Sequence, residues 1–167
     1  RGKFLNVPSF AVINEPICDD YDFTTGPDGL SISTGLLNVK VKSGDSGIAI
    51  FDMQGRSICE DEEYSFLFSR GYIKCKKKSN SSTHYYGLGE KTGYLDKCGR
   101  RYIMWNTDDP LHTPSKDPLY KSIPLLIVFN GEYSYGLFVD KTCRMSFDLG
   151  DDSKEYYTFE VQDDEVD

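Results

Sequence analysis

Carboxylates, a histidine and a lysine gather in one proline-rich segment, residues 108–119. Asp108 and Asp109 open the segment, and His112 and Lys116 follow within it. Carboxylates and imidazoles exchange protons or accept hydrogen bonds from hydroxyl groups. A loop of about this length exceeds the usual connection of roughly 4–6 residues and is more often functional. Prolines lower the entropy cost of holding a loop in one shape. The segment is therefore either a loop that presents side chains or a surface crossover whose prolines only stop edge pairing.

Two reactions use these residue types. Ser115, His112 and Asp109 form a possible serine triad, but nothing in their spacing fixes the geometry that a triad needs. Asp108 and Asp109 are a possible glycosidase pair, whose carboxyl groups stand about 5–5.5 Å apart in retaining enzymes and roughly 6.5–9.5 Å apart in inverting ones. Neighbouring residues of an extended chain point to opposite faces. One carboxylate that binds hydroxyl groups is therefore favoured over a catalytic pair.

Trp105, the single tryptophan, precedes this segment. Its ring is either a stacking platform for a sugar or part of a sandwich core. The only histidines are His84 and His112, and no CxxC pair occurs, so zinc-ligand spacing is absent. Walker, Rossmann and EF-hand patterns are also missing, and Gly87-Leu88-Gly89 is too short for a phosphate loop. The sequence therefore contains none of these zinc, nucleotide or calcium motifs.

The length and net charge of the chain indicate how many domains it has and which partners are unfavourable. A chain of 167 residues fits one domain, and its formal net charge of −8 argues against nucleic acid or an anionic membrane surface as a partner. No apolar stretch approaches the ~18 residues of a membrane-spanning helix. The odd number of cysteines predicts reduced thiols in a cytoplasmic protein. The cysteines are Cys18, Cys59, Cys75, Cys98 and Cys143.

Alternating apolar residues predict a fold built of strands. Residues 37–42 alternate with period two, and residues 123–129 are apolar on both faces, which predicts a strand buried in the core. Asn130-Gly131 predicts a type I′ hairpin to residues 132–140, with Tyr135 and Leu137 on one face and Phe138 on the other. Roughly ten such strands at spacings of about 8–12 residues predict an all-β fold, an antiparallel two-sheet β-sandwich.

Two charged runs flank a second predicted hairpin. Residues 64–68 and 72–76 are predicted to pair across Ser69-Arg70-Gly71. The acidic run 60–63 before them is expected to be a solvated face or loop. Lys76-Lys77-Lys78 is expected to lie on an edge strand, where lysine blocks aggregation.

Several motifs in one order resemble the N-terminal domain of glycoside hydrolase family 31. The match is dense over residues 84–150 and looser before them. The motifs are Tyr86-Gly87-Leu88-Gly89-Glu90-Lys91-Thr92-Gly93, Gly99-Arg100-Arg101-Tyr102, Met104-Trp105-Asn106-Thr107-Asp108, Asp117-Pro118-Leu119-Tyr120-Lys121-Ser122-Ile123-Pro124 and Tyr135-Gly136-Leu137-Phe138-Val139-Asp140.

The resemblance implies a galactose-mutarotase-like β-sandwich packed on a (β/α)8 barrel that performs retaining α-glycoside hydrolysis with two aspartates and no cofactor. It places a substrate contact at Asp108. His112 shares the loop without an assigned role, and we take Asp108, His112 and Trp105 as candidate substrate-binding residues. The sequence ends at Asp167. We therefore expect residues 1–167 to be a single accessory domain of an α-glucosidase-like enzyme that acts on oligosaccharides or glucosides, without the barrel and inactive alone.

Two other functions stay open. The chain is alternatively a free-standing carbohydrate-binding module or a purely structural sandwich. In the structural case, Asp108 forms a turn by bonding its own backbone, as aspartate often does.

Overall fold

The computed structural model describes residues 9, 11–13, 20–44, 47–69 and 71–163. The described residues form twelve β-strands and no helix, which confirms the all-β prediction. No helix in this part of the chain is therefore long and apolar enough to cross a membrane. The strands are β1 (Tyr21–Gly26), β2 (Gly29–Thr34), β3 (Leu37–Lys42), β4 (Ile48–Asp52), β5 (Ser57–Ser69), β6 (Tyr72–Lys78), β7 (His84–Gly89), β8 (Arg101–Met104), β9 (Ser122–Phe129), β10 (Ser134–Phe138), β11 (Met145–Asp148) and β12 (Tyr156–Val161).

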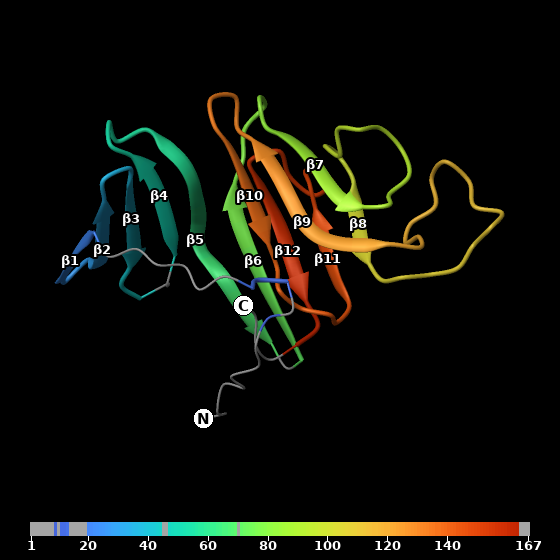
Figure 1. Ribbon diagram of the computed structural model, residues 1–167, viewed down its shortest axis with the longest axis horizontal. Helices are drawn as coiled ribbons and strands as arrows, with labels where there is room; N and C mark the ends of the chain where they lie inside the picture. Colours follow the sequence, from blue (N-terminus) through green and yellow to red (C-terminus); the bar gives the residue numbers. More distant parts are fainter. Residues whose placement is uncertain (1–8, 10, 14–19, 45–46, 70, 164–167) are drawn as a thin grey trace.

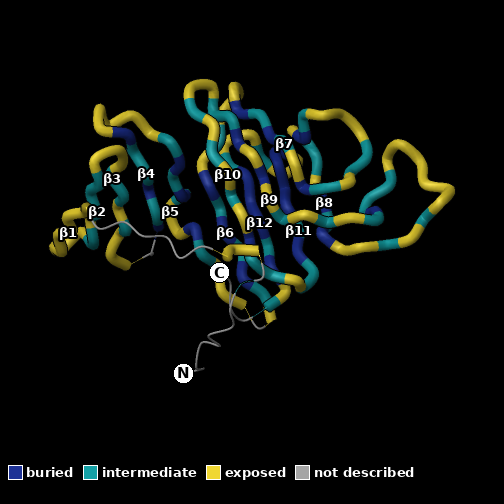
Figure 2. Tube along the Cα trace, in the orientation of Figure 1, coloured by how far each residue is buried: buried dark blue, intermediate teal, exposed yellow. Residues whose placement is uncertain are grey.

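The strands form two antiparallel sheets. The larger has the order β1-β2-β3-β4-β5-β6-β12-β11-β8, and the smaller has the order β10-β9-β7. The small sheet lies over the β6-β12-β11 half of the large one, while β1 to β4 extend beyond it (Figure 1). Buried positions concentrate where the two sheets overlap, and β1 is exposed throughout (Figure 2). The predicted sandwich is therefore confirmed for one half of the large sheet.

The core joins the inward faces of both sheets. Leu126 and Val128 of β9 are fully buried in one cluster with Phe147 of β11 and the rings of Tyr85 and Tyr157. The two tyrosine rings meet edge to face with centroids 5.3 Å apart. A fully buried large apolar side chain contributes roughly 1.5–3 kcal/mol. This cluster therefore holds the small sheet in place against the large one.

The β9–β10 hairpin exists, but its turn is not type I′. Phe129 pairs with Ser134, so four residues form the loop instead of two. Asn130 has no positive φ, and its Oδ1 accepts hydrogen bonds from the backbone amides of Glu132 and Tyr133. The asparagine side chain thereby replaces the backbone geometry that a type I′ turn requires.

Strand β9 is buried on one face only, so the prediction of a strand buried on both faces is wrong. Its pattern alternates, with Leu126 and Val128 inside and Ile123, Leu125 and Ile127 exposed. The small sheet has no second layer over its outer face among the described residues. On β10 the predicted faces are confirmed.

The predictions for the charged runs are also wrong in part. Lys77 belongs to β6, an interior strand between β5 and β12, and its side chain is buried. Its Nζ lies 2.5 Å from Oδ1 of buried Asp61, a residue of the run predicted to be solvated. Asp61 also accepts a hydrogen bond from the amide of Ile48. Each charge is buried because the other compensates for the loss of water.

Candidate functional site

The candidate loop is residues 105–121, which connect β8 to β9 and project from the end of the sandwich (Figure 1). A buried ion pair holds the base of this loop. The Nζ of Lys91 lies 2.9 Å from Oδ1 of Asp117 and also donates to the carbonyl of Ile103, at 2.5 Å. The second oxygen of Asp117 accepts the amide of Ile103. The returning limb of the loop is therefore fixed to β8.

Further hydrogen bonds join the two limbs of the loop to each other. Thr107 donates through Oγ1 to the carbonyl of Pro118, at 2.8 Å, and through its amide to the carbonyl of Leu119. Asn106 Oδ1 accepts the amide of Ser122 at 2.8 Å. Leu119 is buried beneath these bonds. The base is thus ordered by local contacts, and the residues after Thr107 extend from a fixed support.

Asp108 and His112 both interact with Tyr120, which lies on the returning limb of the loop. The rings of His112 and Tyr120 meet edge to face with centroids 6.1 Å apart. Burial and the negative charges of Asp108 and Asp109 raise the pKa of Tyr120. The structure therefore brings together two of the three candidate residues, Asp108 and His112.

Asp109 is engaged within the loop, whereas Asp108 is not. Asp109 forms an ion pair with Lys116 at 3.1 Å, and its carbonyl accepts hydrogen bonds from the amide and Nδ1 of His112. Asp108 is exposed, and no hydrogen bond or ion pair to another described residue occupies its carboxylate. The turn-forming alternative, in which Asp108 bonds its own backbone, is therefore not observed.

Trp105 lies apart from this pair, at the first residue of the loop. Its side chain is 47% exposed, so the alternative of a core tryptophan is wrong. The guanidinium of Arg144 lies over the indole, with its central carbon 5.8 Å from the ring centroid. Trp105 lines a cleft of about 370 Å³ whose other walls come from Asn106, from β8, β9 and β11, and from residues 141–143 between β10 and β11. Neither Asp108 nor His112 lines this cleft.

Comparisons with known proteins agree with this architecture. The family described as the glycosyl hydrolase 31 N-terminal galactose mutarotase-like domain matches residues 1–148. The chain belongs to this family.

Relatives of this family 31 domain are much longer proteins. Alpha-glucosidase 2 of Bacillus thermoamyloliquefaciens is 32% identical over 150 residues, which cover 89% of this chain and 19% of the relative. An alpha-glucosidase of Saccharolobus solfataricus is 34% identical over 97 residues, 51% of this chain and 14% of that protein. The structure of the Flavobacterium johnsoniae GH31 dextranase with isomaltotriose matches with a TM-score of 0.87 and 34% identity, over 97% of this chain and 20% of the dextranase. The chain thus spans about a fifth of the length of alpha-glucosidase 2 and of the dextranase.

The family 31 domain does not assemble the serine triad from its loop. The carboxylate of Asp109 pairs with Lys116, and only the Asp109 carbonyl contacts His112. Ser115 Oγ lies 3.1 Å from Thr113 Oγ1 instead of from the imidazole. Without a base beside the hydroxyl, Ser115 is not an activated nucleophile.

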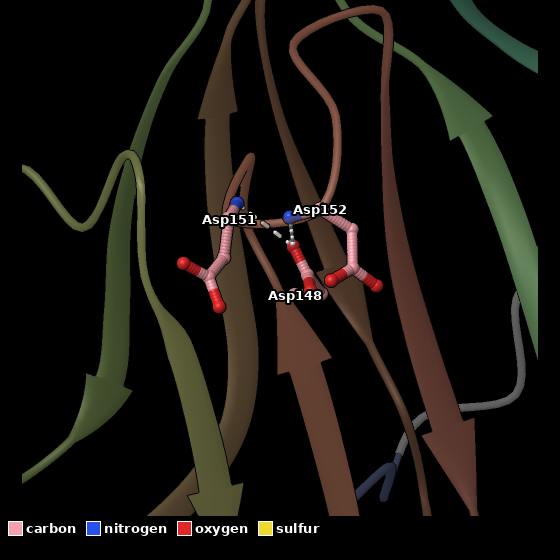
Figure 3. A group of neighbouring side chains, drawn as sticks. All are labelled: Asp148, Asp151 and Asp152. Atoms are coloured by element: carbon pink, nitrogen blue, oxygen red, sulfur yellow. Dashed lines mark hydrogen bonds between the residues drawn. The ribbon is translucent and has the colours of Figure 1, made fainter.

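Sequence reasoning missed one cluster of carboxylates in the family 31 domain, Asp148, Asp151 and Asp152 (Figure 3). Asp148 is already saturated, because Oδ1 accepts the amides of Gly150, Asp151 and Asp152 and Oδ2 accepts from Arg101. Burial alone would raise the pKa of Asp148, but the hydrogen bonds from Arg101 and the backbone amides lower it. The three aspartates therefore form a turn that Arg101 stabilises through Asp148 and Asp152. The guanidinium supplies the positive charge that a metal cation would otherwise bring.

Proposed function

We propose that this chain is the N-terminal accessory domain of a retaining α-glycosidase that acts on terminal α-glucosides, such as oligosaccharides, and that Asp108 contacts the bound sugar. The catalytic carboxylates would lie in a (β/α)8 barrel elsewhere in the full-length protein that contains this chain, here called the parent protein. The proposal rests on Asp108, whose exposed carboxylate forms no hydrogen bond or ion pair with another described residue. The loop that presents it is fixed at its base by the Lys91–Asp117 ion pair. Alpha-glucosidases and a dextranase among the relatives support the substrate class.

The chemistry of Asp108 follows from its charge. A hydrogen bond from a neutral sugar hydroxyl to a charged carboxylate contributes about 1.5–3 kcal/mol. That energy corresponds to roughly 10- to 150-fold in kcat/KM, at about 1.4 kcal/mol per tenfold. His112 would supply a second polar contact from the same loop, and Trp105 a separate stacking surface at the base of the loop.

The test is Asp108→Ala in the parent protein, with Asp109→Ala as the matched control. We expect kcat/KM for an aryl α-glucoside to fall by roughly 10- to 150-fold in the first variant. Asp109→Ala should retain more activity, because its carboxylate is already engaged by Lys116. Melting temperatures of both variants report folding. Unchanged kcat/KM in folded Asp108→Ala would show that the loop only covers the sandwich.

A free-standing carbohydrate-binding module is the second candidate. It would require saturable sugar binding by the 167-residue chain alone, which calorimetry would detect. Membership of a hydrolase-domain family argues against it. The cytoplasmic location stays part of the proposal, and fractionation of the producing cells would test it.

A further inference from the structure

The outer face of the small sheet is apolar and open. Ile123, Leu125 and Ile127 of β9 are 44%, 39% and 43% exposed. Leu126 and Val128, which alternate with them, are buried in the core. Phe138 of β10, opposite Leu125, is 36% exposed. Tyr86 of β7 and Gly136 of β10 flank Ile127. We call these six residues, without Leu126 and Val128, the β9 face.

The β9 face has no charged residue. Strands β7, β9 and β10 contain no Asp, Glu, Lys or Arg at all, in a chain of which 28% is charged. The outer face of the large sheet differs, because Lys74 pairs there across from Glu160. A strand with one face in water alternates apolar and polar residues, whereas a strand that is apolar on both faces is typical of burial on both sides. The sequence of β9 therefore fits a strand that is covered in the parent protein.

The position of the face indicates what covers it. Strand β9 begins at Ser122, directly where the candidate loop returns to the sandwich. A body that contacts Asp108, the residue after Thr107 at the base of this loop, must lie beside the start of β9. A further exposed aromatic pair, Tyr21 and Phe23, lies on β1, at the opposite edge of the large sheet from β8, where the loop begins.

We propose that the β9 face is the surface on which the remainder of the parent protein packs, through an uncharged apolar surface of its own. This inference rests on the proposed function, since it identifies the same body as the one that binds substrate. The relatives contain about four-fifths of their residues outside the matched region, which provides the occupant. Gly136 has no side chain, so the surface around Ile127 is flat enough for a second sheet or helix to approach it closely.

Photocrosslinking in the parent protein tests the occupant. The photoreactive residue p-benzoylphenylalanine, placed at position 138, preserves an aromatic ring on the face. We expect crosslinks to peptides outside residues 1–167 of the same molecule. Crosslinks within residues 1–167, crosslinks to a second copy that fade on a 100-fold dilution, or no crosslink to protein would each overturn the proposal. The matched probe at Phe68, 68% exposed on β5, should give none of the expected peptides.

A pair of substitutions tests the chemistry of the face. Ile127→Gln should lower the yield of the position-138 crosslink at least threefold, because the partner surface lacks a group to pair with the amide. Leu67→Gln, at a residue 54% exposed on β5, should leave the yield unchanged. Equal yields in the two variants would overturn the apolar contact.

The outcomes also separate this inference from the proposed function. If the expected crosslinks form but the kinetics of Asp108→Ala are unchanged, the proposed interface is supported and the proposed substrate contact of the loop is contradicted. If kcat/KM falls in Asp108→Ala but those crosslinks do not form, the substrate contact of the loop is supported and the proposed interface is contradicted.

Discussion

Lys91 and Asp117 form an ion pair in the interior of the protein, with Nζ and Oδ1 2.9 Å apart. The lysine side chain is 0% exposed and the aspartate side chain 10%. Burial lowers the pKa of Lys91, and the hydrogen bond and charge of Asp117 oppose that shift. Because Lys91 follows β7 and Asp117 belongs to the loop after β8, the pair connects two segments that no strand pairing joins.

Breaking this pair should destabilise the protein and loosen the loop. Lys91→Met leaves the carboxylate of Asp117 buried without a cation, a change that costs about 3–5 kcal/mol. Lys116→Met is the control, because the side chains of its pair with Asp109 are 39% and 31% exposed and surface pairs contribute about 0–1 kcal/mol. Urea unfolding measures both variants. Equal, small losses would show that the buried pair does not hold the loop.

Gly87 should not tolerate a side chain. Its φ is +101°, and a Cβ at this position would lie 2.5 Å from the carbonyl oxygen of Leu125 in the neighbouring strand. Overpacking and backbone strain together predict a loss of about 2–4 kcal/mol for Gly87→Ala. Gly55→Ala is the control, since φ is +81° there but no atom lies within 4 Å of the added Cβ. Its loss should be about 1–2 kcal/mol, and similar unfolding curves for the two variants would contradict the clash.

Asp52 should make the protein less stable in acid. The hydroxyl of Tyr133 donates to its carboxylate at 2.6 Å, and this bond, with others from Arg56, lowers the pKa of Asp52 from 3.8 to about 2. Because the folded pKa is the lower one, the stabilisation is complete above about pH 4 and is lost as pH falls toward about 2. The stability difference between the protein and Asp52→Asn should therefore shrink over that range.

Tyr133→Phe provides the control for this prediction. It removes the largest cause of the shift, so the pKa of Asp52 should rise toward its ordinary value. Free energies of unfolding, measured by urea titration at several pH values from 5 to 2, should then show a weaker dependence on pH. A slope in Tyr133→Phe as steep as in the unmodified protein would assign the acid sensitivity to other groups.

Thiol reactivity should follow burial. Cys98 is exposed, whereas burial raises the pKa of Cys75 to about 12, which leaves a thiolate fraction of about 10⁻⁴ at pH 8. In a Cys18→Ser background, which removes the cysteine outside the described residues, a disulfide reagent should modify Cys98 first and Cys75 only after unfolding. Mass spectrometry identifies the sites. Loss of the fast phase in Cys98→Ser would support this order, and rapid modification of Cys75 in the folded protein would contradict it.

Strand periodicity was readable in the sequence because it is local. The alternation of residues 37–42 became β3, and the predicted pairing of residues 64–68 with 72–76 became part of β5 and β6. The order of motifs between residues 84 and 150 was sufficient to name the family. A side-chain period of two depends only on neighbours along the chain, so it survives without knowledge of the fold.

The candidate site was only partly predictable. The length, prolines and carboxylates of the loop marked residues 108–119, but not which aspartate would be engaged. That distinction came from Lys116, which pairs with Asp109 and leaves Asp108 exposed. The separation of Trp105 from Asp108 and His112, which do not line its cleft, followed from the path of the loop.

The sequence alone determined an all-β fold, the position of the β9–β10 hairpin and the family. Tertiary structure alone decided which charges are buried and which apolar residues are exposed. Lys77 is an interior residue because β12 pairs with β6 on one side. On the other side β5 pairs with β6 and places Asp61 opposite Lys77. Ile127 became exposed because no described strand covers the small sheet. Burial depends on which distant segments meet, and strand pairing between distant segments leaves no period in the local sequence.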